Sequence, residues 1–265
     1  MKSEGYIMEN KMKKKLKRGM PVVGTFFGLN STLAVECLGL AGLDFLVIDS
    51  EHGPADVESA MNFIITAELR DITPLVRVKN HSRDSILKML DIGAKGLVIP
   101  CMETLDDVKE VVKYGKYYPT GQRGFAMNRI GGFGFESFSS QGIEKYFQVS
   151  NDETMLIPQC ETKGFLENIE EICLVEGIDG IFIGPYDLSV ALKKPAKFTE
   201  PEYLSAVKRI VKAAKAAGKF VLMHCNNVKE AKKYLQDGFD GITLNQDVVI
   251  LTNAFKEAIM EIKDI

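Results

Sequence analysis

Short apolar blocks recur along the chain, and four of them are introduced by a glycine in the same way. Each of the four begins with Gly, has a charged residue two positions later and continues into an apolar run; they span 42–49, 93–100, 177–184 and 238–245. A glycine after a helical segment is typical of a helix end with positive φ, and the short apolar block after it is typical of a buried strand. We therefore predict a strand in each repeat.

Four further apolar blocks fill the intervals between these repeats, at 21–26, 74–78, 155–160 and 219–224. Strands that are apolar on both faces belong to a parallel sheet covered by helices. The segments between the blocks support this arrangement, because their apolar side chains recur at the helical period. The predicted helices span 83–91, 104–115, 202–217, 227–237 and 249–264.

Eight strands in alternation with helices match the size of a TIM barrel, which uses about 250 residues. A doubly wound sheet would have fewer strands and a G-x-G-x-x-G turn after the first strand, whereas this chain has GLNST there. We predict an α/β fold, a TIM (β/α)8 barrel, in one domain over 1–265. Residues 1–18 form an N-terminal helical extension in this interpretation, and 249–265 form a C-terminal helix.

Composition and charge exclude several other classes of protein. The 265 residues carry 33 basic and 36 acidic side chains, a formal charge of −3, so no nucleic-acid partner is expected. No apolar run approaches the roughly 18 residues that a membrane span needs, and the basic N-terminus lacks the apolar segment of a secretory signal. Five cysteines without C-x-x-C spacing favour reduced thiols in a cytoplasmic protein.

In a TIM barrel the active residues lie at the carboxyl ends of the strands. These positions hold acids, one arginine, amide groups and imidazoles: Asp49, Glu51, His52, Arg77, Gln159, Glu161, Gly184, Tyr186, Asp187 and His224.

Glu161 and Asp187 follow neighbouring strands and form the natural candidate for a metal pair. Two carboxylates suit a hard cation such as Mg²⁺ or Mn²⁺, which would keep open positions for water and a chelating substrate. The alternative is that either acid caps the helix that follows it. Gln159 shares the strand parity of Glu161, so both are expected to face the barrel interior.

His52, directly after a buried strand, is placed as a general base, because its ordinary pKa lies near working pH. Arg77 continues an apolar strand, so it either pairs with a buried acid such as Asp49, or stabilises a developing oxyanion, or does both. His224 is expected to be structural. Lys79 is a minor candidate for a Schiff-base nucleophile.

Other features are expected to be structural or only indirectly involved. Strand alternation turns Cys160 away from the site, Cys101 lies near the barrel mouth behind the reacting groups, and His81 is structural. The lysine-rich stretch 11–17 is interpreted as a solvated helix face. The long connection between 101 and 153 is typical of a functional segment.

Six motifs give the chain a resemblance to a known family: DSEHGP (49–54), PLVRV (74–78), LDIGAKGLVIP (90–100), YPTGQRGF (118–125), PQCET (158–162) and VEGIDGIFIGPYDLS (175–189). On these motifs the chain is similar to the HpcH/HpaI aldolase family of class II pyruvate aldolases, from about Gly19 to the C-terminus. The resemblance implies a barrel of the phosphoenolpyruvate/pyruvate superfamily type. It also implies a homo-oligomer, a hexamer built as a trimer of dimers, with the C-terminal helix exchanged between subunits.

The resemblance also assigns roles to residues. It makes His52 the general base, Arg77 the residue that stabilises the transition state, and Asp91 the aspartate that raises the basicity of the histidine. Asp91 stands out only through the resemblance and not through its spacing.

For binding, the resemblance makes Glu161 and Asp187 the ligands of a divalent metal, with Mg²⁺ or Mn²⁺ favoured and Co²⁺ as a third candidate. Gln159 contacts the keto acid, and the backbone at Gly184 and Tyr186 borders the substrate carboxylate.

The activity implied is reversible cleavage of a 4-hydroxy-2-oxo acid, such as 4-hydroxy-2-oxoheptanedioate or 2-dehydro-3-deoxyglucarate, to pyruvate and an aldehyde. The small-molecule partners are then a 2-oxo acid and an aldehyde, with no nucleic acid and no membrane. Three alternatives stay open: a lyase of the citrate-lyase-β or malyl-CoA type acting on a thioester, a non-catalytic barrel that binds a 2-oxo acid, and a class I aldolase that uses Lys79.

Overall fold

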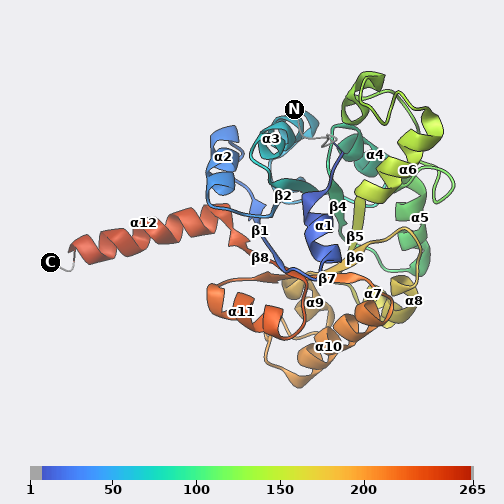
Figure 1. The fold of residues 1–265 in the computed structure, drawn as a ribbon. Helices are drawn as coiled ribbons and strands as arrows, with labels where there is room; N and C mark the ends of the chain where they lie inside the picture. The colour runs from blue at the N-terminus through green and yellow to red at the C-terminus, as the bar shows by residue number, and fades with distance from the viewer. Residues whose placement is uncertain (1–7, 264–265) are drawn as a thin grey trace.

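All eight predicted strands form, and they close into one parallel barrel in the order of the chain (Figure 1). The computed structural model describes residues 8–263. Each strand pairs in parallel with the next, and β8 pairs with β1 to complete the ring. The strands are β1 (Val22–Phe27), β2 (Phe45–Asp49), β3 (Thr73–Arg77), β4 (Gly96–Ile99), β5 (Met155–Cys160), β6 (Gly180–Ile183), β7 (Phe220–Cys225) and β8 (Gly241–Gln246).

Helices follow the strands and surround the barrel, as the periodic segments predicted. The five predicted helices are confirmed, with ends that differ by at most two residues. The helices are α1 (Lys11–Lys17), α2 (Thr32–Leu40), α3 (Val57–Leu69), α4 (Arg83–Asp91), α5 (Leu105–Gly115), the 3-10 helix η1 (Arg129–Gly134), α6 (Ile143–Glu153), α7 (Lys163–Glu167), α8 (Ile169–Cys173), α9 (Pro185–Ala191), α10 (Pro201–Ala216), α11 (Val228–Gln236) and α12 (Asp247–Lys263).

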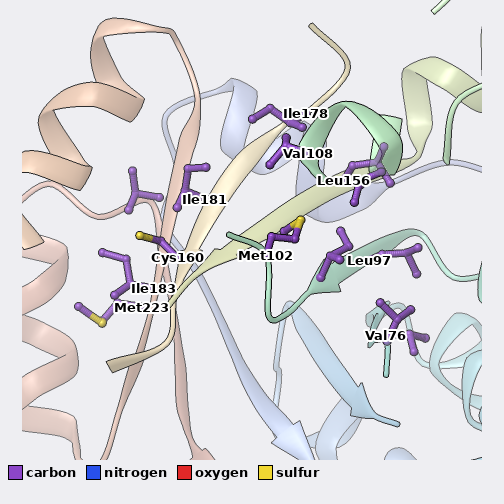
Figure 2. Packing of buried hydrophobic residues seen from close by; sticks show 14 of the residues in the cluster. Val76, Leu97, Met102, Val108, Leu156, Cys160, Ile178, Ile181, Ile183 and Met223 are labelled. Carbon is purple, nitrogen blue, oxygen red and sulfur yellow. The ribbon is translucent and has the colours of Figure 1, made fainter. Parts of the chain in front are cut away.

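Two apolar layers stabilise the barrel, one inside the sheet and one between the sheet and the helices. Alternate residues of each strand point to opposite faces, which assigns them to the two layers. Figure 2 shows part of the outer layer, where Cys160 packs beside Ile181, Ile183 and Met223. The thiol of Cys160 is fully buried there, which confirms the prediction that it turns away from Gln159 and Glu161.

The helix α1 closes the amino end of the barrel, and Figure 1 shows it across that opening. Its Met12 and Leu16 join the apolar cluster inside the barrel. Its Lys13 is buried and forms an ion pair with Asp179 at 2.6 Å. The interpretation of 11–17 as a solvated face is therefore wrong for Lys13, because the helix is used as a plug.

The four glycine repeats have a common structural meaning at this amino end. The positive φ predicted for their glycines is confirmed at Gly42, Gly93, Gly177 and Gly238. In three repeats the charged residue is an aspartate that accepts a hydrogen bond from a backbone N–H of the preceding strand: Asp44 from Val23 at 2.9 Å, Asp179 from Leu156 at 2.9 Å, and Asp240 from Val221 at 2.8 Å. Each of these three repeats thus joins the starts of two neighbouring strands.

Two segments leave the regular barrel plan. The stretch 116–142, together with α6, builds a small aromatic core around Tyr117, Phe138 and Tyr146. No residue of this stretch lines the pocket described below, so the function expected of the long connection is not seen within one chain. The helix α12 projects away from the barrel (Figure 1) and exposes its apolar side chains. None of the described helices is long and apolar enough to cross a bilayer.

Candidate active site

The carboxyl ends of the strands surround a pocket of about 180 Å³. Six of the predicted site residues line it together: His52, Arg77, Gln159, Gly184, Tyr186 and Asp187. Glu161 lies beside them, because it contacts Gln159 and its charge interacts with that of Asp187. A pocket of this volume suits a small polar molecule, since sites for larger ligands usually measure about 300 Å³ or more.

Arg77 is held rigidly by Asp49 from the neighbouring strand. Its Nε and Nη2 donate to the two carboxylate oxygens of Asp49 at 2.9 and 2.7 Å. Burial acts to raise the pKa of Asp49, but the hydrogen bonds and charge of Arg77 hold it below its ordinary value. The predicted pairing is confirmed, and it uses only two of the five N–H bonds of the guanidinium group. Three remain for other partners.

A tight turn after β2 places His52 at the pocket entrance. Asp49 accepts hydrogen bonds from the backbone N–H groups of Glu51 at 3.1 Å and His52 at 3.3 Å. A Cβ at Gly53 would lie 2.3 Å from the carbonyl oxygen of Asp49, so the turn closes only with glycine at this position. The imidazole of His52 is largely exposed, with Nε2 3.9 Å from Glu51. It can therefore reach a substrate that enters the pocket.

Glu161 is buried at the end of β5 between two polar partners. It accepts a hydrogen bond from the backbone N–H of Cys101 at 2.7 Å and contacts the amide nitrogen of Gln159. Burial raises the pKa of Glu161, and the negative charges of Asp187 and Glu51 raise it further. The position of Cys101 at the barrel mouth, behind Glu161, is as predicted.

The loop after β6 approaches Glu161 closely because residue 184 is glycine. A Cβ at Gly184 would lie 2.8 Å from Oε2 of Glu161 and 2.9 Å from the amide nitrogen of Gln159. Gly184 is also the N-cap of α9, and Asp187 lies within its first turn, so the cap interpretation of Asp187 is wrong. Thr162 caps the helix after Glu161, so that acid is not a cap either. Neither carboxylate is therefore used to cap a helix.

Two buried atoms at this end of the barrel form no hydrogen bond with the described residues: the amide oxygen of Gln159, and Oε2 of Glu51, which has only an ion-pair contact with Nη1 of Arg77 at 3.2 Å. Unpaired buried polar atoms are unfavourable unless a ligand, an ion or water contacts them. No group of three or more His, Cys, Asp and Glu side chains within 8–263 is arranged to hold a metal ion. A cation bound here would therefore take two carboxylates, Glu161 and Asp187, and complete its shell from a substrate and water.

Two residues discussed above lie away from this pocket. Asp91 ends α4, at the amino side of the barrel, and pairs with Arg123 at 2.8 Å. Within one chain the structure therefore does not bring Asp91 to His52. Lys79 is exposed beyond the end of β3 and is not a lining residue of the pocket.

No role was predicted for Glu51 from the sequence, although Glu51 lies between Asp49 and His52, which were both assigned roles. Its Oε2 lies 3.2 Å from Nη1 of Arg77, and its Oε1 lies 3.6 Å from the thiol of Cys101. His224, expected to be structural, lines the pocket. Its position near the end of β7 could have predicted this, because strand alternation turns the side chain of His224 toward the barrel interior.

These observations define the class of site: a pocket at the carboxyl end of a TIM barrel, with a carboxylate cluster opposite a fixed arginine. Comparisons with known proteins agree with this class. The HpcH/HpaI aldolase/citrate lyase family model matches residues 23–254. The chain therefore belongs to the HpcH/HpaI aldolase/citrate lyase family.

Individual relatives cover almost the whole chain. It is 34% identical to a hydroxypyruvate/pyruvate aldolase of Roseobacter denitrificans, over 93% of this chain and 94% of that protein. It is 32% identical to a 4-hydroxy-2-oxo-heptane-1,7-dioate aldolase of Shigella sonnei, over 93% and 92%. A solved HpcH/HpaI aldolase/citrate lyase family protein from Burkholderia cenocepacia superimposes with a TM-score of 0.88 and 30% identity, over 96% of this chain and 99% of that one.

Proposed function

We propose that the protein is a divalent-metal-dependent aldolase, a carbon–carbon lyase that cleaves a 4-hydroxy-2-oxo acid to pyruvate and an aldehyde. The observation that carries this proposal is the pairing of Glu161 and Asp187 beside Gln159, opposite an arginine that is held by Asp49. Relatives named as aldolases over nearly the full chain support the same reaction class.

The residues of the pocket fit a hard cation such as Mg²⁺ or Mn²⁺. Glu161 and Asp187 are oxygen donors whose mutual repulsion a cation would relieve, and Gly184 leaves room beside Glu161. When bound, such a cation acts as a Lewis acid that favours an enolate over its keto form. Gln159 and the backbone at Gly184 and Tyr186 then orient the 2-oxo acid.

Arg77 and His52 carry out the parts of the reaction that belong to the protein. Asp49 accepts only two of the five N–H bonds of Arg77, and those that neither Asp49 nor Glu51 occupies stabilise negative charge on the oxygen of the departing pyruvate enolate. His52, at the pocket entrance, takes the proton from the 4-hydroxyl group as the C3–C4 bond breaks. Asp49 links the two groups, since it binds both the Arg77 side chain and the His52 backbone.

The test is pyruvate release from candidate substrates. Purified protein with Mg²⁺ or Mn²⁺ is offered 4-hydroxy-2-oxoheptanedioate, 2-dehydro-3-deoxyglucarate and malyl-CoA, and pyruvate or glyoxylate is measured. Release of pyruvate from a 4-hydroxy-2-oxo acid, abolished by EDTA, supports the proposal. Cleavage of malyl-CoA alone favours a thioester lyase, and 2-oxo-acid binding without turnover favours a non-catalytic barrel. Trapping of pyruvate on Lys79 by borohydride would indicate a class I aldolase.

We also propose that the chain forms a homo-oligomer through α12, a hexamer in the arrangement that the family resemblance implies. Phe255, Met260 and Ile262 of this projecting helix are each more than half exposed, and such apolar side chains are typical of an interface. Removal of 249–265 is expected to lower the molar mass measured by light scattering from that of a hexamer to that of a smaller assembly.

A cytoplasmic location is proposed as well. All five cysteines are free thiols, which suits a reducing compartment.

A further inference from the structure

One side of the pocket is formed by side chains to which the aldolase reaction, as proposed, assigns no role. His224 on β7, Gln246 at the end of β8 and Phe26 on β1 line it, and Tyr186 borders it from α9. The ring of His224 is packed edge-on against Phe26 at 5.6 Å between centroids and lies 6.5 Å from Tyr186. We call these four residues the β7–β1 wall. Its imidazole is held in one place and faces the cavity.

The order of the strands indicates which half of the substrate meets this wall. The 2-oxo acid is assigned to Gln159 near the end of β5 and to Asp187 after β6, and the 4-hydroxyl group to His52 after β2. None of the described residues of β4 lines the pocket, and Arg77 fills the β3 side. The part of the substrate beyond C4 therefore lies along the remaining arc, from β7 through β8 to β1. This part becomes the aldehyde.

The hydrogen bond to Thr243 defines which proton His224 presents to the cavity. Nδ1 lies 3.1 Å from Oγ1 of Thr243, a residue without solvent exposure. Within the described part of the chain, His224 is the only hydrogen-bond partner found for the Thr243 hydroxyl. A buried hydroxyl proton needs an acceptor, so Thr243 donates to Nδ1 and the imidazole carries its own proton on Nε2. His224 thus offers an N–H donor to the pocket.

The β7–β1 wall suits a neutral polar group of the substrate better than a charged group. Burial, with a smaller effect from Arg77, lowers the pKa of His224 to about 4, so its imidazole is neutral at working pH. Arg77 is the only permanent cation among the described lining residues; Asp49 and Glu51 pair with it, and its remaining N–H bonds are assigned to the enolate. A carboxylate at the far end of the aldehyde would therefore find no free cation, whereas a hydroxyl group would find a neutral donor and the amide of Gln246.

We infer that His224, oriented by Thr243, is a specificity-determining residue that binds a hydroxyl group on the aldehyde half, so that the enzyme prefers short hydroxyaldehydes. The inference rests on the proposed function and narrows its substrate class. Such aldehydes carry an acceptor oxygen within reach of C4, as glycolaldehyde does, whereas propanal has the same number of heavy atoms and lacks it.

The experiment measures kcat/KM for aldol addition of pyruvate, with Mg²⁺, to glycolaldehyde, propanal and succinic semialdehyde. For the wild-type protein we expect glycolaldehyde to exceed propanal by about tenfold or more, the effect of one hydrogen bond, and to exceed succinic semialdehyde as well. His224→Leu should reduce the glycolaldehyde-to-propanal ratio about tenfold. His224→Gln, which keeps an N–H donor, should restore part of it, and Thr243→Val should lower it.

A control variant is His81→Gln, since His81 lies outside the pocket near Asp107 at 3.8 Å and should leave the ratio unchanged. If His224→Leu does not fold, the glycolaldehyde-to-propanal ratio of kcat/KM is measured for His224→Gln and Thr243→Val, and these two variants test the inference. An unchanged ratio, or equal losses for glycolaldehyde and propanal, would overturn the inference by making His224 purely structural. Deuterium exchange at pyruvate without any preference for glycolaldehyde overturns this inference alone, whereas the absence of both exchange and addition overturns the proposed function with it.

Discussion

The two ends of the barrel both remove charged side chains from water, but they balance them differently. At the amino end each of these buried charges has a partner of opposite sign, since Asp179 contacts both Lys13 at 2.6 Å and Lys116 at 3.6 Å. At the carboxyl end negative charge accumulates, and burial together with the charge of Asp187 raises the pKa of Glu161.

The difference separates stability from function. Matched buried charges and hydrogen-bonded aspartates stabilise the starts of the strands, where the helix α1 closes the barrel. Unmatched carboxylates and unpaired polar atoms at the other end are unfavourable in the free protein and become favourable when a cation and a substrate bind. Changes at the amino end should therefore alter folding alone, whereas changes at the carboxyl end should alter chemistry, and also stability where they break the buried pair of Asp49 and Arg77.

The largest effect is expected for Arg77→Ala. Loss of a preorganised donor to an oxyanion reduces kcat by about a hundredfold or more. The change also leaves Asp49 buried without its partner, which destabilises proteins by about 3–5 kcal/mol. Initial rates and urea unfolding measure the two effects, and retained turnover in a folded variant would contradict the assigned role of Arg77.

Glu161→Gln should separate the two properties. We expect metal-stimulated turnover to fall about a hundredfold, a loss similar to that of Arg77, because one of two carboxylate ligands is removed. Without metal, the variant should be at least as stable as the wild type, since a buried charge next to Asp187 is neutralised. A clear drop in the denaturation midpoint of the metal-free variant would show that Glu161 is structural.

Asp179→Asn is the matched change at the amino end. It removes the partner of Lys13 and should destabilise the fold by about 3 kcal/mol, as expected when a buried pair is broken. The activity per folded molecule should stay within about twofold, because the site is at the other end. Unfolding curves and active-site titration check both values, and a selective loss of activity would undermine the division between the ends.

The last effect concerns Lys116, and it appears only at alkaline pH. Burial lowers the pKa of Lys116 to about 8, against 10.5 for a lysine side chain exposed to water, while the charge of Asp179 opposes the shift. Between these values the unfolded chain binds more protons, so this group makes the fold more stable as pH rises, by at most about 1.4 kcal/mol per pH unit.

The measurement compares the free energy of unfolding of the wild type and Lys116→Met from pH 7 to 10.5. The difference between the two curves should rise with pH in the wild type's favour above about pH 8, whereas a flat difference would mean that the folded lysine titrates normally.

The fold could be predicted almost completely from the chain, because periodicity reports which face of each element is buried. The glycine repeats also predicted the positive φ values, which are a local backbone property. The burial of Lys13 could not be predicted, since it depends on Asp179, a partner 166 positions away that only the closed barrel supplies.

The sequence predicted those site residues whose position follows from lying at the carboxyl end of a strand. Arg77 and Asp49 occupy paired positions on adjacent strands, so their contact follows from the register. Glu51 was given no role and His224 was expected to be structural, because their roles depend on side-chain neighbours from other strands. Asp91 came from the resemblance alone, and its place at the far end of the barrel shows that one chain does not bring it to His52.

The most direct test of the central claim follows the methyl protons of pyruvate by NMR in D₂O, with the protein and Mg²⁺, and then with excess EDTA. The account predicts exchange for deuterium that requires the metal and disappears in Glu161→Gln. Exchange that persists in EDTA would contradict it and indicate Schiff-base chemistry, and a lack of exchange with Mg²⁺ would contradict metal-assisted enolisation at this carboxylate pair.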